Sequence, residues 1–292
     1  MRGSKRNTGI ASPISTVILT GTIMVIVLTT AAYADRVFLF KVAESDFKSA
    51  KQFMRTLALQ VDDVAWLMGK TETLSYSSRF GEVTVLPSAL NYTVYVKVEG
   101  GEGYEFFASY VTDILVFNIP LSSYSLFNGY YESILPPSKG EIVLWGAAVP
   151  AMRVFAVEKL PMGDGEFVRV VAAPSMRILN STVEVVGGND TLYLKLYLPI
   201  LRHRDSPRIA QSVTLRGVSV TASTIDHVES INVTVSFPQQ SSQLGFDESF
   251  FQFPSLSTVI DVPEGYSGTV LELHIGEVDV TLGLPTLFNG GS

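Results

Sequence analysis

The first 68 residues carry a hydrophobic pattern with the period of a helix. Residues 14–34 contain no charged side chain, and a helix of that length is about 30 Å long, which matches the hydrocarbon core of a bilayer. Beyond Asp35, apolar residues recur at alternating steps of three and four, which places them along one side of a helix. This seam is Phe40, Ala43, Phe47, Ala50, Met54, Leu57, Val61, Val64 and Met68. We therefore predict one helix over residues 10–70, apolar over 10–34 and amphipathic over 35–70.

Two partners could cover this seam. It can pack against the β-rich part of the same chain, or it can form a coiled coil with other subunits. The two are compatible, because the seam can serve the chain's own head while the apolar run before it contacts other copies. From Ile14 to Met68 this helix would be about 80 Å long, more than twice what one membrane span requires.

After Gly69 the pattern changes to period two, which is typical of strands with one buried face. Residues 92–98, 192–198 and 271–275 alternate in this way, and shorter runs such as 82–86 bring the total to about a dozen strands. We expect an α+β fold, in which a very long N-terminal helix precedes a mainly antiparallel, sandwich-like head over residues 71–292. If the head divides in two, residues 161–165 are the best place for the boundary.

Composition narrows the class of protein. Of the 292 residues, 47% are hydrophobic and 17% are charged, below the roughly 25% charge of typical soluble proteins. The net charge of −7 gives no reason to expect nucleic acid as a partner. The absence of cysteine excludes disulfides, cysteine-based zinc sites, thiol nucleophiles and a lipidated cysteine.

Charges around the apolar run predict its orientation. Arg2, Lys5 and Arg6 precede it, and no acid occurs before Asp35, so the positive-inside rule keeps the N-terminus in the cytoplasm and the head outside. A cleaved secretory signal is the second interpretation, since residues 32–34 (AYA) fit the small-x-small rule. Against it, the run exceeds the usual 7–15 residues of such a signal and the helical pattern continues past that cut. An uncleaved single-span anchor is the third interpretation.

The N-terminus also resembles a known family. Residues 5–19, KRNTGIASPISTVIL, look like the start of archaeal type IV pilin-like proteins, which have a short basic leader, a glycine, a Ser-Pro-Ile/Val step and an apolar helix. The resemblance implies that a membrane aspartic peptidase removes residues 1–9, with Arg6 and Gly9 flanking the cut and Ile10 starting the mature chain. Here Asn7 and Thr8 separate the basic residue from the glycine, whereas the family usually places them side by side.

In that family the apolar helix first holds the subunit in the membrane and then packs with its neighbours as the filament core. The residues expected in this core are Ile14, Val17, Ile18, Gly21, Ile23, Val25, Val27 and Leu28. Small residues such as Gly21 allow helices to approach closely, although they are common in any membrane helix. The expected function is a structural subunit of a surface filament, whose partners are copies of itself, the prepilin-type peptidase, the assembly machinery and, before assembly, the membrane. The alternative is a non-polymerising single-span protein that displays a β-domain for binding or adhesion.

A search for chemistry yields little. His203, His227 and His274 have no partner at metal-ligand spacing, and the adjacent Asp62 and Asp63 point about 100° apart on a helix, so they cannot face one substrate. No nucleophile elbow, phosphate loop, dinucleotide fingerprint or zinc helix is present. We expect no catalytic site, metal or cofactor, and an enzyme acting on carbohydrate or peptide is the weakest hypothesis.

Four Asn-x-Ser/Thr triplets fall in the head, at Asn91, Asn180, Asn189 and Asn232. Each is a candidate for N-glycosylation, and such triplets often arise by chance. Asn180 and Asn189 flank an expected hairpin and should be exposed. Asn91 and Asn232 begin or lie within strands, so they could carry a glycan only on a face exposed to solvent.

Overall fold

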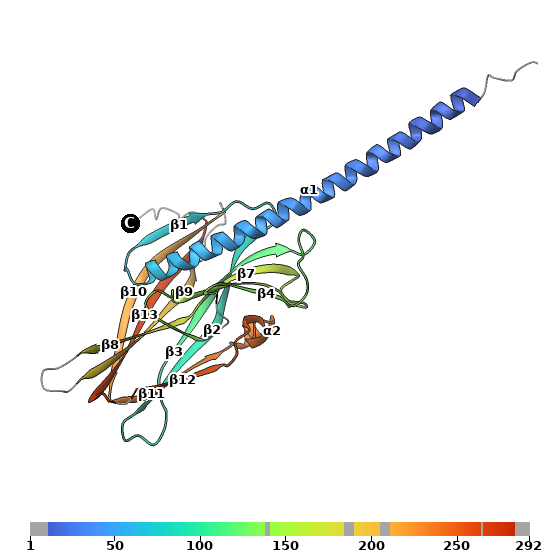
Figure 1. Cartoon of the computed structure of the whole chain (residues 1–292). Helices are drawn as coiled ribbons and strands as arrows, with labels where there is room; N and C mark the ends of the chain where they lie inside the picture. Colours follow the sequence, from blue (N-terminus) through green and yellow to red (C-terminus); the bar gives the residue numbers. More distant parts are fainter. Residues whose placement is uncertain (1–10, 138–140, 184–189, 205–210, 264, 284–292) are drawn as a thin grey trace, which may run out of the picture.

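One long helix dominates the architecture. The computed structural model describes residues 11–137, 141–183, 190–204, 211–263 and 265–283. Helix α1 (Ala11–Ala65) runs unbroken for 55 residues, about 80 Å. Pro13 lies in its first turn, where no intrahelical N–H is needed, and no glycine or proline occurs between Gly21 and Gly69. Figure 1 shows the N-terminal half of α1 projecting from the head as a rod, while its C-terminal half lies along the head.

The head contains two sheets, and the first has six strands in the order β1-β10-β13-β9-β8-β5. Its strands are β1 (Thr71–Ser75), β5 (Val143–Trp145), β8 (Met176–Val183), β9 (Thr191–Arg204), β10 (Ser212–Asp226) and β13 (Gly268–Leu282). Pairing is antiparallel except between β13 and β9 and between β5 and β8, which are parallel.

The second sheet has seven strands in the order β12-β11-β2-β3-β7-β6-β4, and every pairing in it is antiparallel. Its strands are β2 (Glu82–Val98), β3 (Glu105–Pro120), β4 (Tyr130–Leu135), β6 (Met152–Glu158), β7 (Phe167–Pro174), β11 (Val228–Ser236) and β12 (Ser257–Asp261). The α+β class with a mainly antiparallel head is therefore confirmed. Residues 161–165 connect β6 and β7, which pair directly with each other, so this segment is a connection within one sheet rather than a boundary.

Two hydrophobic cores hold these layers together. The sheet core lies between the two sheets, and the helix core lies between α1 and the sheets. Strand β7 contributes to both, because successive side chains of a strand point to opposite faces: Val171 belongs to the sheet core, whereas Val170 and Ala172 belong to the helix core. Every residue of β6 is buried, since this strand is also covered on both faces.

Two short helices complete the sheet core. They are α2 (Gln239–Gln243) and α3 (Glu248–Phe251). Asp247 caps α3 by accepting a hydrogen bond from the backbone N–H of Phe250 at 3.0 Å. Phe250 and Phe251 are fully buried and contact Phe155 of β6, so this segment fills the sheet core with aromatic side chains.

Candidate assembly site on the projecting helix

The projecting part of α1 is uncovered on every side. Each residue from 15 to 38 is exposed, and we call this segment the free half. Val25, Ile26, Val27 and Leu28 are 57–69% exposed. Because successive helical residues are about 100° apart, four in a row sample the whole circumference. The head therefore shields no side of this part of the helix.

The residues expected in a filament core lie almost entirely within the free half. Those described there are Val17, Ile18, Gly21, Ile23, Val25, Val27 and Leu28, all of them exposed. Apart from the adjoining backbone of the helix itself, no atom lies within 4 Å of the place where a side chain on Gly21 would begin. Ile14 lies in α1, but its side chain is outside the described set, and Arg6, Gly9 and Ile10 are outside the described residues.

The chemistry of the free half suits an apolar environment. By length and composition α1 could cross a membrane, with a mean hydropathy of 2.0 over an 18-residue window in which no residue is buried. Two of its hydroxyl groups bond within the helix, since Thr22 and Thr29 donate to the carbonyls of Ile18 and Val25 at 2.9 and 2.8 Å. Such internal pairing is what a spanning helix needs where water is absent.

Leaving this segment in water would be costly. Nine large apolar side chains between residues 17 and 28 are more than half exposed. At about 1.5–3 kcal/mol for fully burying each, they represent about 14–27 kcal/mol of hydrophobic free energy. That exceeds the total stability of many domains, about 5–15 kcal/mol, so the segment requires a lipid or protein environment.

The seam of α1 faces the head. Ala43, Phe47, Ala50, Met54, Leu57, Val61 and Val64 are all buried in the helix core. From Ala43 to Val64 the seam therefore packs against the chain's own head, the first of the two partners considered, and not against other subunits. Phe40 is about half exposed, and Met68 lies beyond the end of α1 and is exposed, so neither belongs to the buried part.

Polar contacts fix the register of α1 on the head. The carboxylate of Asp46 accepts hydrogen bonds from Ser78 Oγ and from the backbone N–H groups of Arg79 and Phe80, at 2.8–3.1 Å. Nearer the C-terminal end of α1, Asp62 accepts a hydrogen bond from Arg177 Nη1 at 3.2 Å. Sequence reasoning missed the role of Asp46, because its partners lie more than 30 residues away.

Asp62 and Asp63 point apart, as their adjacency on a helix predicts. Asp62 contacts Arg177 of β8 and the backbone of Ala151, whereas Asp63 pairs with Lys70. On the solvent side of the same helix, Lys41 and Lys48 both hydrogen-bond Glu44 and hold the pKa of its carboxyl down at about 2. These charges form no shared acidic site.

Two glycines let the end of α1 lie directly against the first sheet. A Cβ on Gly217 of β10 would stand 2.5 Å from the carbonyl oxygen of Leu67, and one on Gly276 of β13 would stand 2.3 Å from that of Ala65. Both distances are too short for any side chain. Gly217 also exchanges backbone hydrogen bonds with Gly69 and Lys70 at 2.8 and 2.9 Å. Helix α1 therefore ends at Ala65, five residues before the predicted end at residue 70, because the chain turns there to meet β10.

Where α1 leaves the head, an aromatic contact marks the junction. Tyr124, in the connection between β3 and β4, lies 5.5 and 5.4 Å from Phe40 and Phe47 (ring centroids). The buried carboxylate of Glu158 holds this connection by accepting from the backbone N–H of Leu126 at 2.7 Å. The head covers the helix only up to this level.

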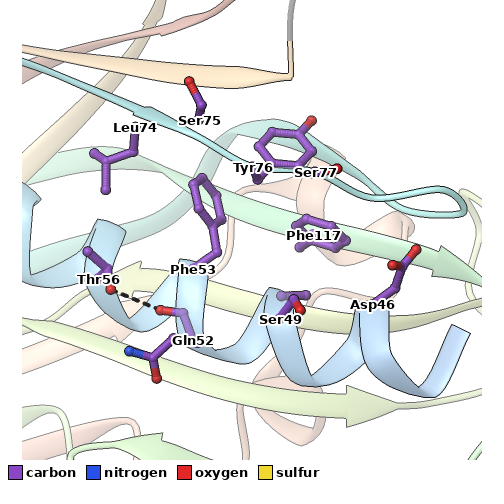
Figure 2. A pocket seen from close by; sticks show the side chains of 11 residues that line it. Asp46, Ser49, Gln52, Phe53, Thr56, Leu74, Ser75, Tyr76, Ser77 and Phe117 are labelled. Atoms are coloured by element: carbon purple, nitrogen blue, oxygen red, sulfur yellow. Dashed lines mark hydrogen bonds between the residues drawn. The ribbon is translucent and has the colours of Figure 1, made fainter. Parts of the chain in front are cut away.

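A groove runs beside the part of α1 that packs on the head, residues 43–65, which we call the seated half. It has a volume of about 500 Å³ and lies between α1, the end of β1 and Phe117 of β3 (Figure 2). Phe53 and Tyr76 face each other across it, with ring centroids 5.0 Å apart. Its only acid, Asp46, is occupied by the backbone of residues 79–80. Three serines also line the groove, Ser49, Ser75 and Ser77, but none of its lining residues is a histidine, lysine or arginine.

The other candidates are dispersed over the head. His274 stacks on Tyr197 at 4.8 Å, and His227 lies at the opposite end of β10 from α1. Asn180 is exposed in β8, Asn91 and Asn232 are partly exposed in β2 and β11, and Asn189 lies outside the described residues. No group of three or more potential metal ligands occurs among the described residues.

The described surface thus contains one large feature that its own fold leaves unsatisfied, the free half of α1 with residues 37–40 at its base. Val37 and Phe38 lie beyond the charged pair Asp35 and Arg36 and remain exposed. No family model, curated protein or solved structure matches this chain.

Proposed function

We propose that this protein is the structural subunit of an archaeal type IV pilus-like surface filament. The free half of α1 holds the subunit in the cytoplasmic membrane with its N-terminus inside, and then packs against the same segment of neighbouring subunits. The head stays outside, where it supplies the filament's surface, its lateral contacts and its adhesion. Its partners are its own copies, a prepilin-type peptidase and the assembly machinery, and we propose that the exposed head carries glycans.

The observation that carries the proposal is the exposure of Val37, Phe38 and Phe40. A lone membrane anchor would bury residues up to Ala34 in lipid and leave Val37 and Phe38 in the headgroup region or in water, together with the half of Phe40 that Tyr124 of the head does not cover. A bundle of neighbouring helices buries these side chains as well as the apolar run before them. Exposed apolar surface of this extent is typical of interaction sites.

The division of α1 supports the same function. The seam is already occupied by the chain's own head, so it is not available for a coiled coil. The free half is unoccupied on all sides, which suits a helix with several neighbours rather than one. A homopolymer provides identical neighbours for every subunit, and head-to-tail contacts that do not close produce a filament.

Filament yield with Phe38→Ser tests the proposal against the lone anchor. Phe38 is 59% exposed and lies outside the uncharged run, so the variant should insert into the membrane normally. Losing one buried phenylalanine per subunit, worth about 1.5–3 kcal/mol, should cut assembly at least tenfold. Phe127→Ser is the matched control, because Phe127 is 60% exposed on the head. Unchanged filament yield from an inserted Phe38→Ser protein would favour the single-span alternative.

Close packing at Gly21 gives a second test. Gly21→Leu should insert well, because leucine is favourable in lipid, yet it should abolish filaments where neighbouring helices approach at this glycine. Electron microscopy of shed material and membrane fractionation separate the two effects. Val25→Asp should also abolish filaments, although the aspartate can block insertion as well. Normal filaments from inserted Gly21→Leu would refute close packing there.

The mature N-terminus separates the three interpretations of the leader. Mass spectrometry of protein from the native cell surface should give a start between Asn7 and Ile10 after prepilin-type processing. A start at Asp35 would mean ordinary secretion, and the free half would then be absent from the mature protein. An intact Met1 would indicate a plain membrane anchor.

A further inference from the structure

The outer face of the second sheet carries an unusual row of side chains far from α1. Strands β12, β11, β2 and β3 lie side by side there, and β11 and β12 lie at the end of the head away from the projecting helix (Figure 1). One cross-strand row consists of Val259, Asn232, Tyr95 and Phe106 in direct register. Their sequence neighbours Val94, Ile231 and Ile260 are buried in the sheet core, so the row itself faces solvent.

This row differs from the rows on either side of it. The preceding row has only small hydroxyl side chains: Ser257, Thr234, Thr93 and Ser109. The following row is polar and charged: Asp261, Ser230 and Lys97. Phe106 is 64% exposed, and its ring lies 6.2 Å from that of Tyr95, edge to face. The rings of Tyr95 and Phe106 are thus exposed to water. The short serine and threonine side chains of the preceding row leave the space beside these rings open.

Asn232 is presented for modification in the middle of this row. It begins the triplet Asn232-Val233-Thr234. Its Oδ1 accepts a hydrogen bond from Ser257 Oγ at 2.6 Å, on the β12 side. Its Nδ2 has no hydrogen-bond partner among the described residues. That hydrogen bond therefore orients the amide and leaves the nitrogen unengaged.

The amide of Asn91 is differently placed. Its Nδ2 donates to Ser236 Oγ at 3.4 Å, and its Oδ1 accepts from Ser109 Oγ at 2.9 Å. Both ends of this amide are occupied, so modification would break an existing network. Asn180 is exposed, but its register partner on β9 is Leu194, which is buried in the sheet core. Of the three described triplets, only Asn232 combines a free amide nitrogen with neighbouring exposed rings.

We propose that Asn232 carries an N-linked glycan whose first sugars lie on the ring pair of Tyr95 and Phe106. In the attachment step, Nδ2 bonds to the anomeric carbon of an activated sugar, and the bond from that carbon to a phosphate leaving group breaks. The nitrogen loses one proton to the base of the transferase. The donor is a glycosyl phosphate or pyrophosphate, and the leaving group departs with the bonding electron pair.

The ring pair accounts for where the glycan lies. The C–H groups on the apolar face of a pyranose carry a slight positive charge, which suits the negative face of an aromatic ring. Covering Phe106 in this way removes apolar surface from water. The neighbouring row of serine and threonine side chains is short, so it leaves room for the sugar without a steric clash. The glycan thus covers an aromatic surface that would otherwise favour association of heads.

Glycopeptide mass spectrometry tests occupancy on protein purified from its native cells. Cleavage after glutamate releases residues 230–248, in which Asn232 starts the only triplet. We expect a glycan mass on this peptide and its loss in both Asn232→Gln and Thr234→Ala. Both variants keep the strand, because their side chains face solvent. An unmodified peptide 230–248 from native protein would overturn the proposal.

A double-mutant comparison tests the contact between the glycan and the rings. Phe106→Ala should lower the Tm of the glycosylated protein by about 2–4 °C, the scale of one aromatic contact in a domain of this size. In the Asn232→Gln background the same change should have an effect below about 1 °C. Phe127→Ala, an equally exposed phenylalanine, should give the same small shift in both backgrounds. Equal shifts for Phe106→Ala in both backgrounds would overturn the stacking.

This inference rests on the proposed function only in placing the head outside the cell. Glycan occupancy is measured on the subunit, whether or not it is in filaments. Occupied Asn232 without filaments would leave the inference intact and remove the filament. Filaments with an unmodified Asn232 would leave the proposed function intact and overturn the glycan.

Discussion

At the scale of single residues, the close contact between α1 and the first sheet depends on two glycines, whose lack of a side chain lets the backbones approach. Gly217 and Gly276 come from strands more than 50 residues apart, yet both face backbone carbonyls of residues 64–67. Neither glycine lies in a turn motif, and Gly276 follows an alternating run that reads as an ordinary strand. Sequence patterns could not predict this close approach, because its cause lies in another element.

Gly276→Ala should destabilise the seated end of α1. The new Cβ would stand 2.3 Å from a backbone oxygen that cannot rotate away, so we expect a loss of about 1–3 kcal/mol, as for overpacked cores. Urea unfolding of the protein in detergent measures it. Gly103→Ala is the control, since nothing lies within 4 Å of its Cβ position. Equal stability of the two variants would contradict the packing described here.

At the scale of elements, the helix and the head could be predicted from the sequence, but their junctions could not. The 3.5-residue period identified the seam correctly from Ala43 to Val64, although it left open which partner covers it. The runs at residues 82–86 and 92–98 were expected as separate strands. They form one strand, β2, with a register shift between Leu86 and Leu90. There the backbone N–H of Ser88 bonds to the buried Asp113 at 2.7 Å, a partner 25 residues away.

Two methionines on α1 test the division of the helix. Met54 is completely buried, and Met24 is 63% exposed. Met54→Ala should cost about 2–5 kcal/mol of unfolding free energy by opening a cavity in the helix core. Met24→Ala should leave the stability of the monomer in detergent unchanged within about 0.5 kcal/mol. Similar losses for both would mean that the free half packs on the head.

At the scale of the whole molecule, the parallel pairing of β9 with β13 connects segments about 75 residues apart along all of β9. Alternation in each strand predicted its buried face, but no local signal identifies such distant partners. Strands β6 and β7 show a different limit, because each packs on two cores at once. Their residues are buried without alternation, so the sequence predicted the strands without predicting that both faces are covered.

Two truncations should show that the head folds with the seam and without the free half. A chain of residues 39–292 keeps every α1 residue of the helix core, so it should be soluble and monomeric by light scattering, with the Tm of the full protein. A chain of residues 71–292 lacks all nine buried α1 residues of that core and should aggregate or unfold. Aggregation of residues 39–292 to the same degree as the full chain would show that the free half is not the associating surface.

The absence of glycine and proline between Gly21 and Gly69 has a mechanical consequence. Helices bend sharply at such residues, and α1 offers none where the rod enters the head. Tension along a polymer of these subunits would therefore reach each head as shear, spread over the whole seam at once, instead of peeling contacts one by one. Because the helix has no hinge, each head would also keep a fixed orientation relative to the polymer axis. Such a fibre would stretch little before its subunits slid apart.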